Sequence, residues 1–179
     1  METHASRTLL LSVVQMPSIP LRDRAFIAFL FLTGARVGEV VYKIQKKQVS
    51  FAKVDGKDFL IVYDVHTEKR KIDIARNIPI EIEREQVFVD VVLRWTDQLQ
   101  PEDVMFDFNR TRGFQITKKH LGRGPHFLRH SRLTNLATEY GFDSGDLAEF
   151  VGWASWRTAE TYTHKDYTDL ARKMAARAK

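Results

Sequence analysis

The chain has 179 residues, enough for one domain with a proper core, and 44% of them are hydrophobic. Its net charge of +5 is modest, and many proteins this basic never bind nucleic acid. The absence of cysteine excludes disulfides, thiolate metal sites and a cysteine nucleophile. The six histidines lack metal-ligand spacing, and the apolar run Leu9–Val14 is too short for a signal peptide or membrane span. These features favour a soluble, cytoplasmic protein without a metal or other cofactor.

The first part of the chain predicts helices followed by a small sheet. Helices are expected at Thr8–Gln15, Leu21–Leu32 and Arg36–Ile44. Between the second and third, Gly34 suits a left-handed helix cap. Strands rich in Val, Ile and Phe are expected at Gln48–Lys53, Phe59–Val65 and Lys71–Ile80. Asp55-Gly56 between the first two strands predicts a hairpin, so the sheet should be antiparallel.

The rest of the chain predicts helices separated by glycine-containing breaks. They are expected at Glu83–Gln98, Gly113–Leu121, Phe127–Tyr140, Gly145–Val151, Thr158–His164 and from Tyr167 to the end. The fold class is therefore α+β and mainly helical, with a small three-stranded antiparallel sheet.

An arginine stands at the predicted start of the third helix, in the sequence TGARVGE. Helix N-termini favour anions, and the Arg36 guanidinium can grip two phosphate oxygens at once. A surface ion pair between Arg36 and Glu39 is the plainer alternative. A second arginine stands in HFLRHS, where His126 and Arg129 are three apart and should share one face of a helix. His130 is expected to be structural.

A tyrosine completes this set. Tyr162 follows Trp153 by nine residues, and a tyrosine hydroxyl that attacks a phosphodiester forms a covalent phosphotyrosyl intermediate. Free tyrosine has a pKa of about 10, so the hydroxyl needs cationic or proton-accepting neighbours at neutral pH. Tyr167 is the rival nucleophile, but it would break the nine-residue interval.

TGARVGE, HFLRHS, VGW and Tyr162, in this order and spacing, resemble the catalytic domain of the tyrosine recombinases, or phage integrase family. The resemblance implies that Arg36 and Arg129 clamp the reacting phosphate, that Glu39 holds Arg36 from behind, and that His126 transfers a proton or binds phosphate. It also implies that Tyr162 is the nucleophile.

Two further positions are assigned by the resemblance with alternatives open. Most members have histidine where this chain has Trp153, although some carry tryptophan there. Its indole N–H can donate to phosphate but cannot transfer protons, and a core role is the alternative. The general acid should be a lysine between the second and third strands. Lys69, at the tip of this basic turn, is favoured over Lys71.

The resemblance implies a site-specific recombinase that cleaves and rejoins double-stranded DNA without metal or ATP. Residues 1–179 would form the catalytic domain, without the usual N-terminal core-binding domain, as a fragment or a minimal member. Residues 167–179 would form a helical tail that joins protomers into a dimer or tetramer on DNA. Type IB topoisomerase-like relaxation and an inactive DNA-binding module are the alternatives.

Overall fold

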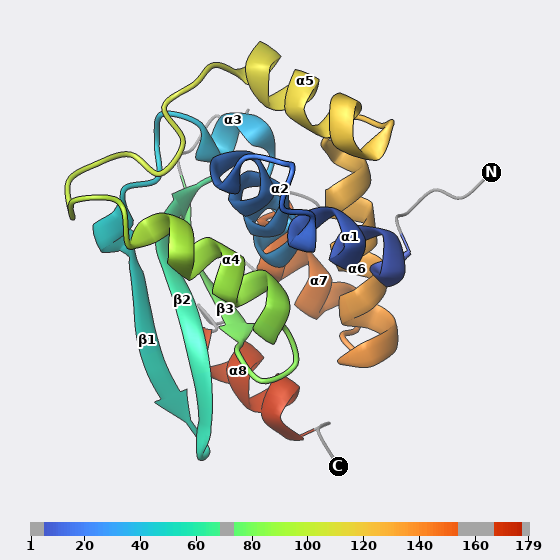
Figure 1. Cartoon of the computed structure of the whole chain (residues 1–179). Coiled ribbons are helices and arrows are strands. Elements are labelled where there is room, and N and C mark those ends of the chain that lie inside the picture. Colours follow the sequence, from blue (N-terminus) through green and yellow to red (C-terminus); the bar gives the residue numbers. More distant parts are fainter. Residues whose placement is uncertain (1–5, 69–73, 154–166, 177–179) are drawn as a thin grey trace.

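The computed structural model describes residues 6–68, 74–153 and 167–176, which form a helical body with a sheet along one side (Figure 1). The first helices are α1 (Arg7–Gln15), α2 (Leu21–Thr33) and α3 (Val37–Val40), followed by a short 3₁₀ turn, η1 (Lys46–Gln48). The strands are β1 (Val49–Val54), β2 (Lys57–His66) and β3 (Ala75–Glu81). The later helices are α4 (Gln86–Thr96), α5 (Arg110–Leu121), α6 (His126–Glu139), α7 (Ser144–Val151) and α8 (Tyr167–Ala176). The predicted mainly helical α+β class is confirmed.

The sheet is antiparallel with strand order β1-β2-β3, as the sequence predicted. The turn between β1 and β2 places Asp55 at φ 49° and Gly56 at φ 79°. Two successive residues with positive φ match a hairpin turn whose twist suits the flanking strands. In the central strand β2 every residue from Phe59 to Val62 is buried, so both faces of the sheet are covered along this stretch.

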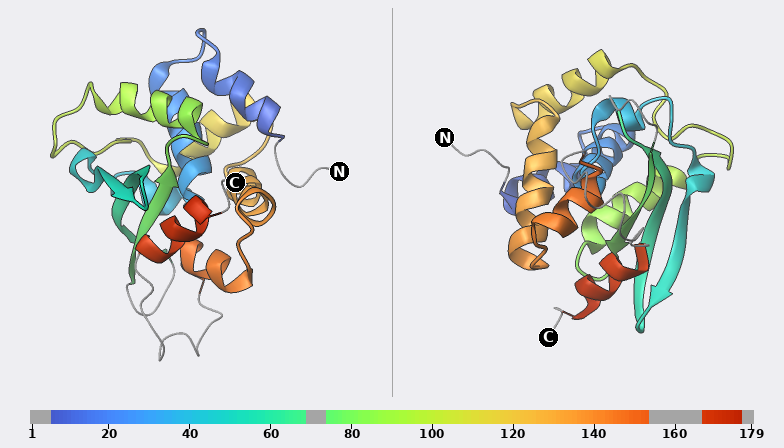
Figure 2. Two further views of the ribbon diagram at one scale, coloured as in Figure 1. Left: turned by 90° about the horizontal axis from the view of Figure 1, so that it is seen from below. Right: turned by 180° about the vertical axis from the view of Figure 1, so that it is seen from behind.

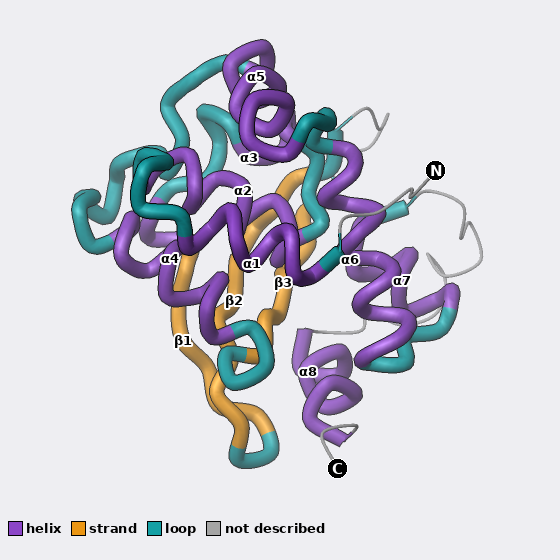
Figure 3. Tube along the Cα trace, turned by 45° about the vertical axis from the view of Figure 1, so that its right-hand side comes forward, coloured by secondary structure: helices purple, strands orange, loops and turns teal. Residues whose placement is uncertain are grey.

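Helix α2 forms the centre of the core. Every residue from Ala25 to Thr33 is buried, and the helix contacts α1, α4, α5, α6 and β3 (Figure 3). Gly34 ends it at φ 60°, the left-handed conformation expected from the sequence. The chain therefore leaves the core abruptly and delivers Arg36 to the surface.

The third helix is shorter than predicted. It was expected over Arg36–Ile44 and ends at Val40, because Tyr42 adopts a positive φ of 58° that interrupts helical geometry. The main chain after it instead bonds to a distant loop, with the Met105 N–H donating to the Ile44 carbonyl at 2.7 Å. Tertiary pairing here overrides local helix propensity.

Several other boundaries shift by a few residues. Strand β3 begins at Ala75 rather than Lys71, and α4 begins at Gln86 rather than Glu83. Helix α5 begins at Arg110 instead of Gly113, because the Asn109 side chain caps it by accepting from the Arg112 N–H at 2.8 Å. The helix expected at Thr158–His164 lies outside the described residues.

The C-terminal helix α8 packs on the chain's own sheet. Leu170, Ala171 and Met174 are buried, and the helix contacts β1 and β3 (Figure 2). The helix is amphipathic, and its apolar face is covered within the chain.

Within the described ranges, no helix is both long enough and apolar enough to cross a membrane.

Candidate active site

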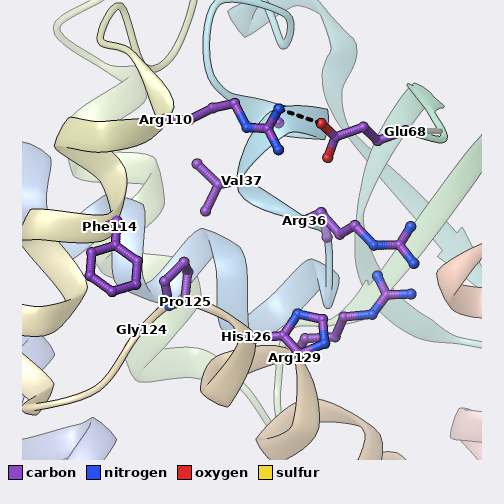
Figure 4. Close-up of a pocket in the computed structure, with 11 residues that line it drawn as sticks. Arg36, Val37, Glu68, Arg110, Phe114, Gly124, Pro125, His126 and Arg129 are labelled. Atoms are coloured by element: carbon purple, nitrogen blue, oxygen red, sulfur yellow. Dashed lines mark ion pairs between the residues drawn. The ribbon is translucent and has the colours of Figure 1, made fainter.

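Three of the predicted site residues line one pocket, which has a volume of about 410 Å³. Arg36 comes from the start of α3, whereas His126 and Arg129 come from the first turn of α6. Figure 4 shows the guanidinium groups of the two arginines pointing the same way, with the imidazole beside them. The fold therefore brings together two motifs that are far apart in the sequence.

Arg36 is held from below by a buried carboxylate. Glu39 has no exposed surface, and it accepts a hydrogen bond from the Arg36 main-chain N–H at 2.9 Å. Its other oxygen lies 3.3 Å from Nη1 of Arg36. The alternative of a surface ion pair is wrong, because the carboxylate lies beneath the pocket and only the guanidinium reaches solvent.

Glu39 also links the other segments of the site. It accepts from Nη2 of Arg76 at 3.0 Å and from the main-chain N–H of Glu68 at 3.2 Å. Burial alone would raise the pKa of Glu39, but the charge of Arg76 and the hydrogen bonds outweigh it and lower that pKa below its usual value. Arg76 also donates to the Phe150 carbonyl at 3.0 Å. The sequence analysis did not select Arg76, because no short spacing in the sequence relates it to Glu39.

Arg129 is nearly buried, at 3% exposed. Its Nη1 donates to the Gly34 carbonyl at 2.7 Å and its Nη2 to the Val151 carbonyl at 3.4 Å. Burial, and after it the neighbouring charge of Arg36, lowers the pKa of Arg129 to about 10, although Glu39 opposes the shift. The group remains charged at neutral pH. Because the cations Arg36 and Arg129 line the same pocket, they favour binding of an anion there.

Trp153 lies beside the arginine rather than in the core. Its side chain is 41% exposed, and Cζ of Arg129 lies 5.9 Å from its ring centroid. The alternative of a core tryptophan is therefore wrong. Gly152 before it has φ 70°, and a Cβ there would lie 2.5 Å from Cγ2 of Thr67. This glycine permits the end of α7 to touch the end of β2.

His126 has an exposed side chain whose ring lies edge-on to that of His130, with 5.1 Å between centroids. Partial burial lowers the pKa of His126, and positive charge at His130, Arg129 and Arg36 lowers it further. The imidazole is therefore neutral at physiological pH and can accept a proton. His130 is exposed and adjoins the site, so the expected structural packing role is not observed.

For the DNA cleavage that the resemblance implies, we expect the pH dependence to report this imidazole. Because a neutral imidazole accepts the proton, the rate should rise with pH through a midpoint below 6.5, the ordinary value. His126→Gln should remove this acidic limb. In the control His130→Gln, the limb should move to higher pH, because one repelling charge is lost. An unchanged limb in His126→Gln would show that another group titrates.

Three predicted residues, Lys69, Lys71 and Tyr162, lie outside the described residues. Of the other tyrosines, Tyr140 is buried and donates to Oε1 of Glu85 at 3.0 Å, which makes it unsuitable as a nucleophile. Tyr167 is half-buried, with its ring 6.0 Å edge-on from that of Tyr63.

The part of the chain that the structure describes contains no group of three or more His, Asp or Glu side chains placed to hold a metal ion.

Glu68 and Arg110 also line the pocket, and the sequence analysis did not select either. Glu68 directly precedes Lys69 in the predicted basic turn, and Arg110 begins α5. No spacing in the sequence relates the two, because their proximity results from the folded position of α5.

Comparison with known proteins supports one family. The phage integrase family matches residues 3–169. The chain is 29% identical over 161 residues to tyrosine recombinase XerA of Pyrococcus furiosus, covering 83% of this chain and 52% of the relative. It is 30% identical over 169 residues to tyrosine recombinase XerC of Chlorobaculum parvum, covering 83% and 47%. The chain thus spans about half the length of the curated relatives it matches.

Solved structures show the same fold. The XerH site-specific recombinase bound to difH substrate, in a pre-cleavage complex, matches with a TM-score of 0.61 and 21% identity, covering 96% of this chain and 53% of that chain. A crystal structure of XerA recombinase matches with a TM-score of 0.59 and 19% identity, covering 100% and 66%. At this identity the similarity concerns the fold.

Proposed function

The chain belongs to the phage integrase family, and from that premise we propose that it is a site-specific recombinase acting on double-stranded DNA. The observation that carries the proposal is the convergence of Arg36, Arg129 and His126 on one pocket. Two guanidinium groups beside a proton-accepting imidazole suit a phosphodiester whose negative charge increases in the transition state. The XerH site-specific recombinase bound to difH substrate has the same fold, which supports DNA as the partner.

In the proposed reaction, the Tyr162 hydroxyl attacks the phosphorus and transfers its proton to His126. The bond to the 5′-oxygen breaks, which leaves a 3′-phosphotyrosyl link and a 5′-hydroxyl protonated by Lys69. The 5′-hydroxyl of a second strand then attacks the link and releases the tyrosine. Arg36 and Arg129 stabilise the non-bridging oxygens throughout, and Trp153 donates one further N–H. Metal and ATP have no part in these steps.

Strand transfer distinguishes this reaction from its alternatives. A nicked duplex that carries a candidate site should give a covalent protein–DNA adduct, and adding a strand with a free 5′-hydroxyl should give a recombinant product. Supercoil relaxation without transfer to another strand would instead indicate a type IB topoisomerase activity. Binding without adduct would indicate an inactive DNA-binding module.

The general acid can be assigned by sulfur substitution of the bridging 5′-oxygen. An acid contributes typically about 100- to 10,000-fold by protonating the leaving oxygen, whereas a thiolate leaves without that help. We expect Lys69→Ala to be slow on ordinary DNA and restored on the sulfur-substituted strand. Lys71→Ala should show a small loss without rescue. The reverse pattern would assign the acid to Lys71.

We further propose that protomers assemble on DNA as a dimer or tetramer through the tail at residues 167–179. Because Leu170 and Met174 are buried on the chain's own sheet, coupling would require this helix to exchange between copies. A chain that lacks residues 167–179 should then lose most of its assembly on DNA. Its free energy of unfolding should fall only slightly. Loss of folding in the truncated chain would show that the helix serves its own core only.

A further inference from the structure

A carboxylate occupies one end of the arginine-lined pocket. Oε1 of Glu68 lies 2.7 Å from Nη1 of Arg110, an ion pair drawn as a dashed line in Figure 4. The Glu68 side chain is only 14% exposed, whereas that of Arg110 is 61% exposed. The Glu68 carboxylate therefore lies inside the pocket, and Arg110 lies on its solvent-exposed side.

The carboxylate rests directly on the main chain of α3. A Cβ at Gly38 would lie 2.5 Å from Oε1 of Glu68 and 2.7 Å from Oε2, so the carboxylate can lie here only because this residue has no side chain. Gly38 thus provides a hollow for an anion between Arg110 and the Arg36 motif. Because the Glu68 main-chain N–H is bonded to Glu39, the residue is anchored beside this hollow.

The charges around the pocket favour a phosphate in this hollow. Among the residues that the structure describes, three arginines line the pocket, namely Arg36, Arg110 and Arg129, and Glu68 is the one acidic residue in the lining. Glu39 is buried beneath and already accepts from Arg76. A cleft with this excess of positive charge concentrates anions. Carboxylates and phosphates present similar pairs of oxygens to a guanidinium, so one can replace the other at Arg110.

We propose that Arg110 and Gly38 form a second phosphate subsite, adjacent to Arg36 and Arg129, which Glu68 occupies until a backbone phosphate of DNA displaces it. The inference rests on the proposed function, and it assigns to the same pocket a neighbouring phosphodiester of the reacting duplex. Glu68 acts there as an internal competitor: it neutralises Arg110 in the free protein and weakens DNA binding.

The test measures binding of a short fluorescein-labelled duplex of arbitrary sequence by anisotropy over a series of salt concentrations. Glu68→Gln keeps the shape but removes the charge, and should bind about threefold or more tightly than the wild type. Arg110→Ala should bind more weakly, and the slope of log affinity against log salt should fall by about 0.9, the value for one phosphate contact. In the Arg110→Ala background, Glu68→Gln should give a smaller gain.

Asp58→Asn is the matched control. Asp58 pairs with Lys53 at 3.1 Å, both side chains are exposed, and the pair lies next to the β1–β2 turn, at the opposite end of the molecule from α5 (Figure 1). It makes the same change in net charge and should leave affinity nearly unchanged. Unchanged or weaker binding by Glu68→Gln would overturn the subsite, as would an equal gain from Asp58→Asn.

Failure of the subsite can be distinguished from failure of the proposed function. If the wild type forms covalent adduct but Glu68→Gln does not bind more tightly, only the subsite is wrong. If the affinities change as expected but no adduct forms on any duplex, the phosphate subsite stands and the cleavage activity fails.

Discussion

Replacing Arg129 with lysine will slow strand cleavage by about a thousandfold, the scale expected when a preorganised donor to transition-state charge is lost. The guanidinium is fixed by the carbonyls of Gly34 and Val151. Its remaining N–H groups are therefore already held in fixed directions before substrate binds. Lysine keeps the charge but has no planar fork, and it cannot bond both carbonyls and still hold two phosphate oxygens.

The measurement is single-turnover cleavage of a nicked duplex, with binding of the same duplex followed separately. Arg112→Lys is the control, because Arg112 is exposed on α5 and the charge is again kept. The control should cleave at nearly the wild-type rate. If Arg129→Lys cleaves within about tenfold of the wild type, the clamp would need only a charge at this position, against the expectation for a bidentate contact.

Removing one partner of the buried Arg132–Glu85 pair will lower the free energy of unfolding by about 3–5 kcal/mol. Both side chains are at most 1% exposed, and Nη1 of Arg132 lies 2.8 Å from Oε1 of Glu85. The same carboxylate accepts from Arg7 at 2.9 Å and from the Tyr140 hydroxyl. Burial raises the pKa of Tyr140, so this hydroxyl stays protonated and donates. Arg132→Met would leave the carboxylate without its buried countercharge.

Urea unfolding of two variants tests this account. The double variant Arg132→Met with Glu85→Gln removes both charges and should be more stable than Arg132→Met alone, because no unpaired charge remains buried. A double variant no more stable than Arg132→Met alone would contradict the cost assigned to the unpaired buried carboxylate. Cleavage per folded molecule should change little, since Arg132 lies behind the pocket rather than in its lining.

The turn and the helix cap that depend on only one or two residues were predicted correctly from the sequence. Asp55-Gly56 formed the expected hairpin and Gly34 the expected left-handed cap, because each depends on backbone preferences of one or two residues. The length of α3 was predicted wrongly, since the chain after Val40 is set by pairing with a loop more than sixty positions away. The start of α5 was missed because Asn109, its capping residue, was not recognised as a signal.

The site residues that belong to sequence motifs could be predicted, whereas those brought to the site by packing could not. Arg36, His126 and Arg129 were selected from their spacing and do line one pocket. The contacts of Arg76 with Glu39 and of Arg110 with Glu68 depend on how β3 and α5 pack, and no short spacing in the sequence encodes them. The roles of Lys69 and Tyr162 remain predictions from the resemblance.

Identifying the tyrosine that joins to DNA tests the central claim most directly. The adduct formed on a nicked duplex would be digested with protease and nuclease, and the peptide that carries the nucleotide would be sequenced by mass spectrometry. We expect the link at Tyr162, no adduct with Tyr162→Phe despite nearly unchanged duplex binding, and normal adduct with Tyr167→Phe. A link at Tyr167, or adduct that persists in Tyr162→Phe, would contradict the account.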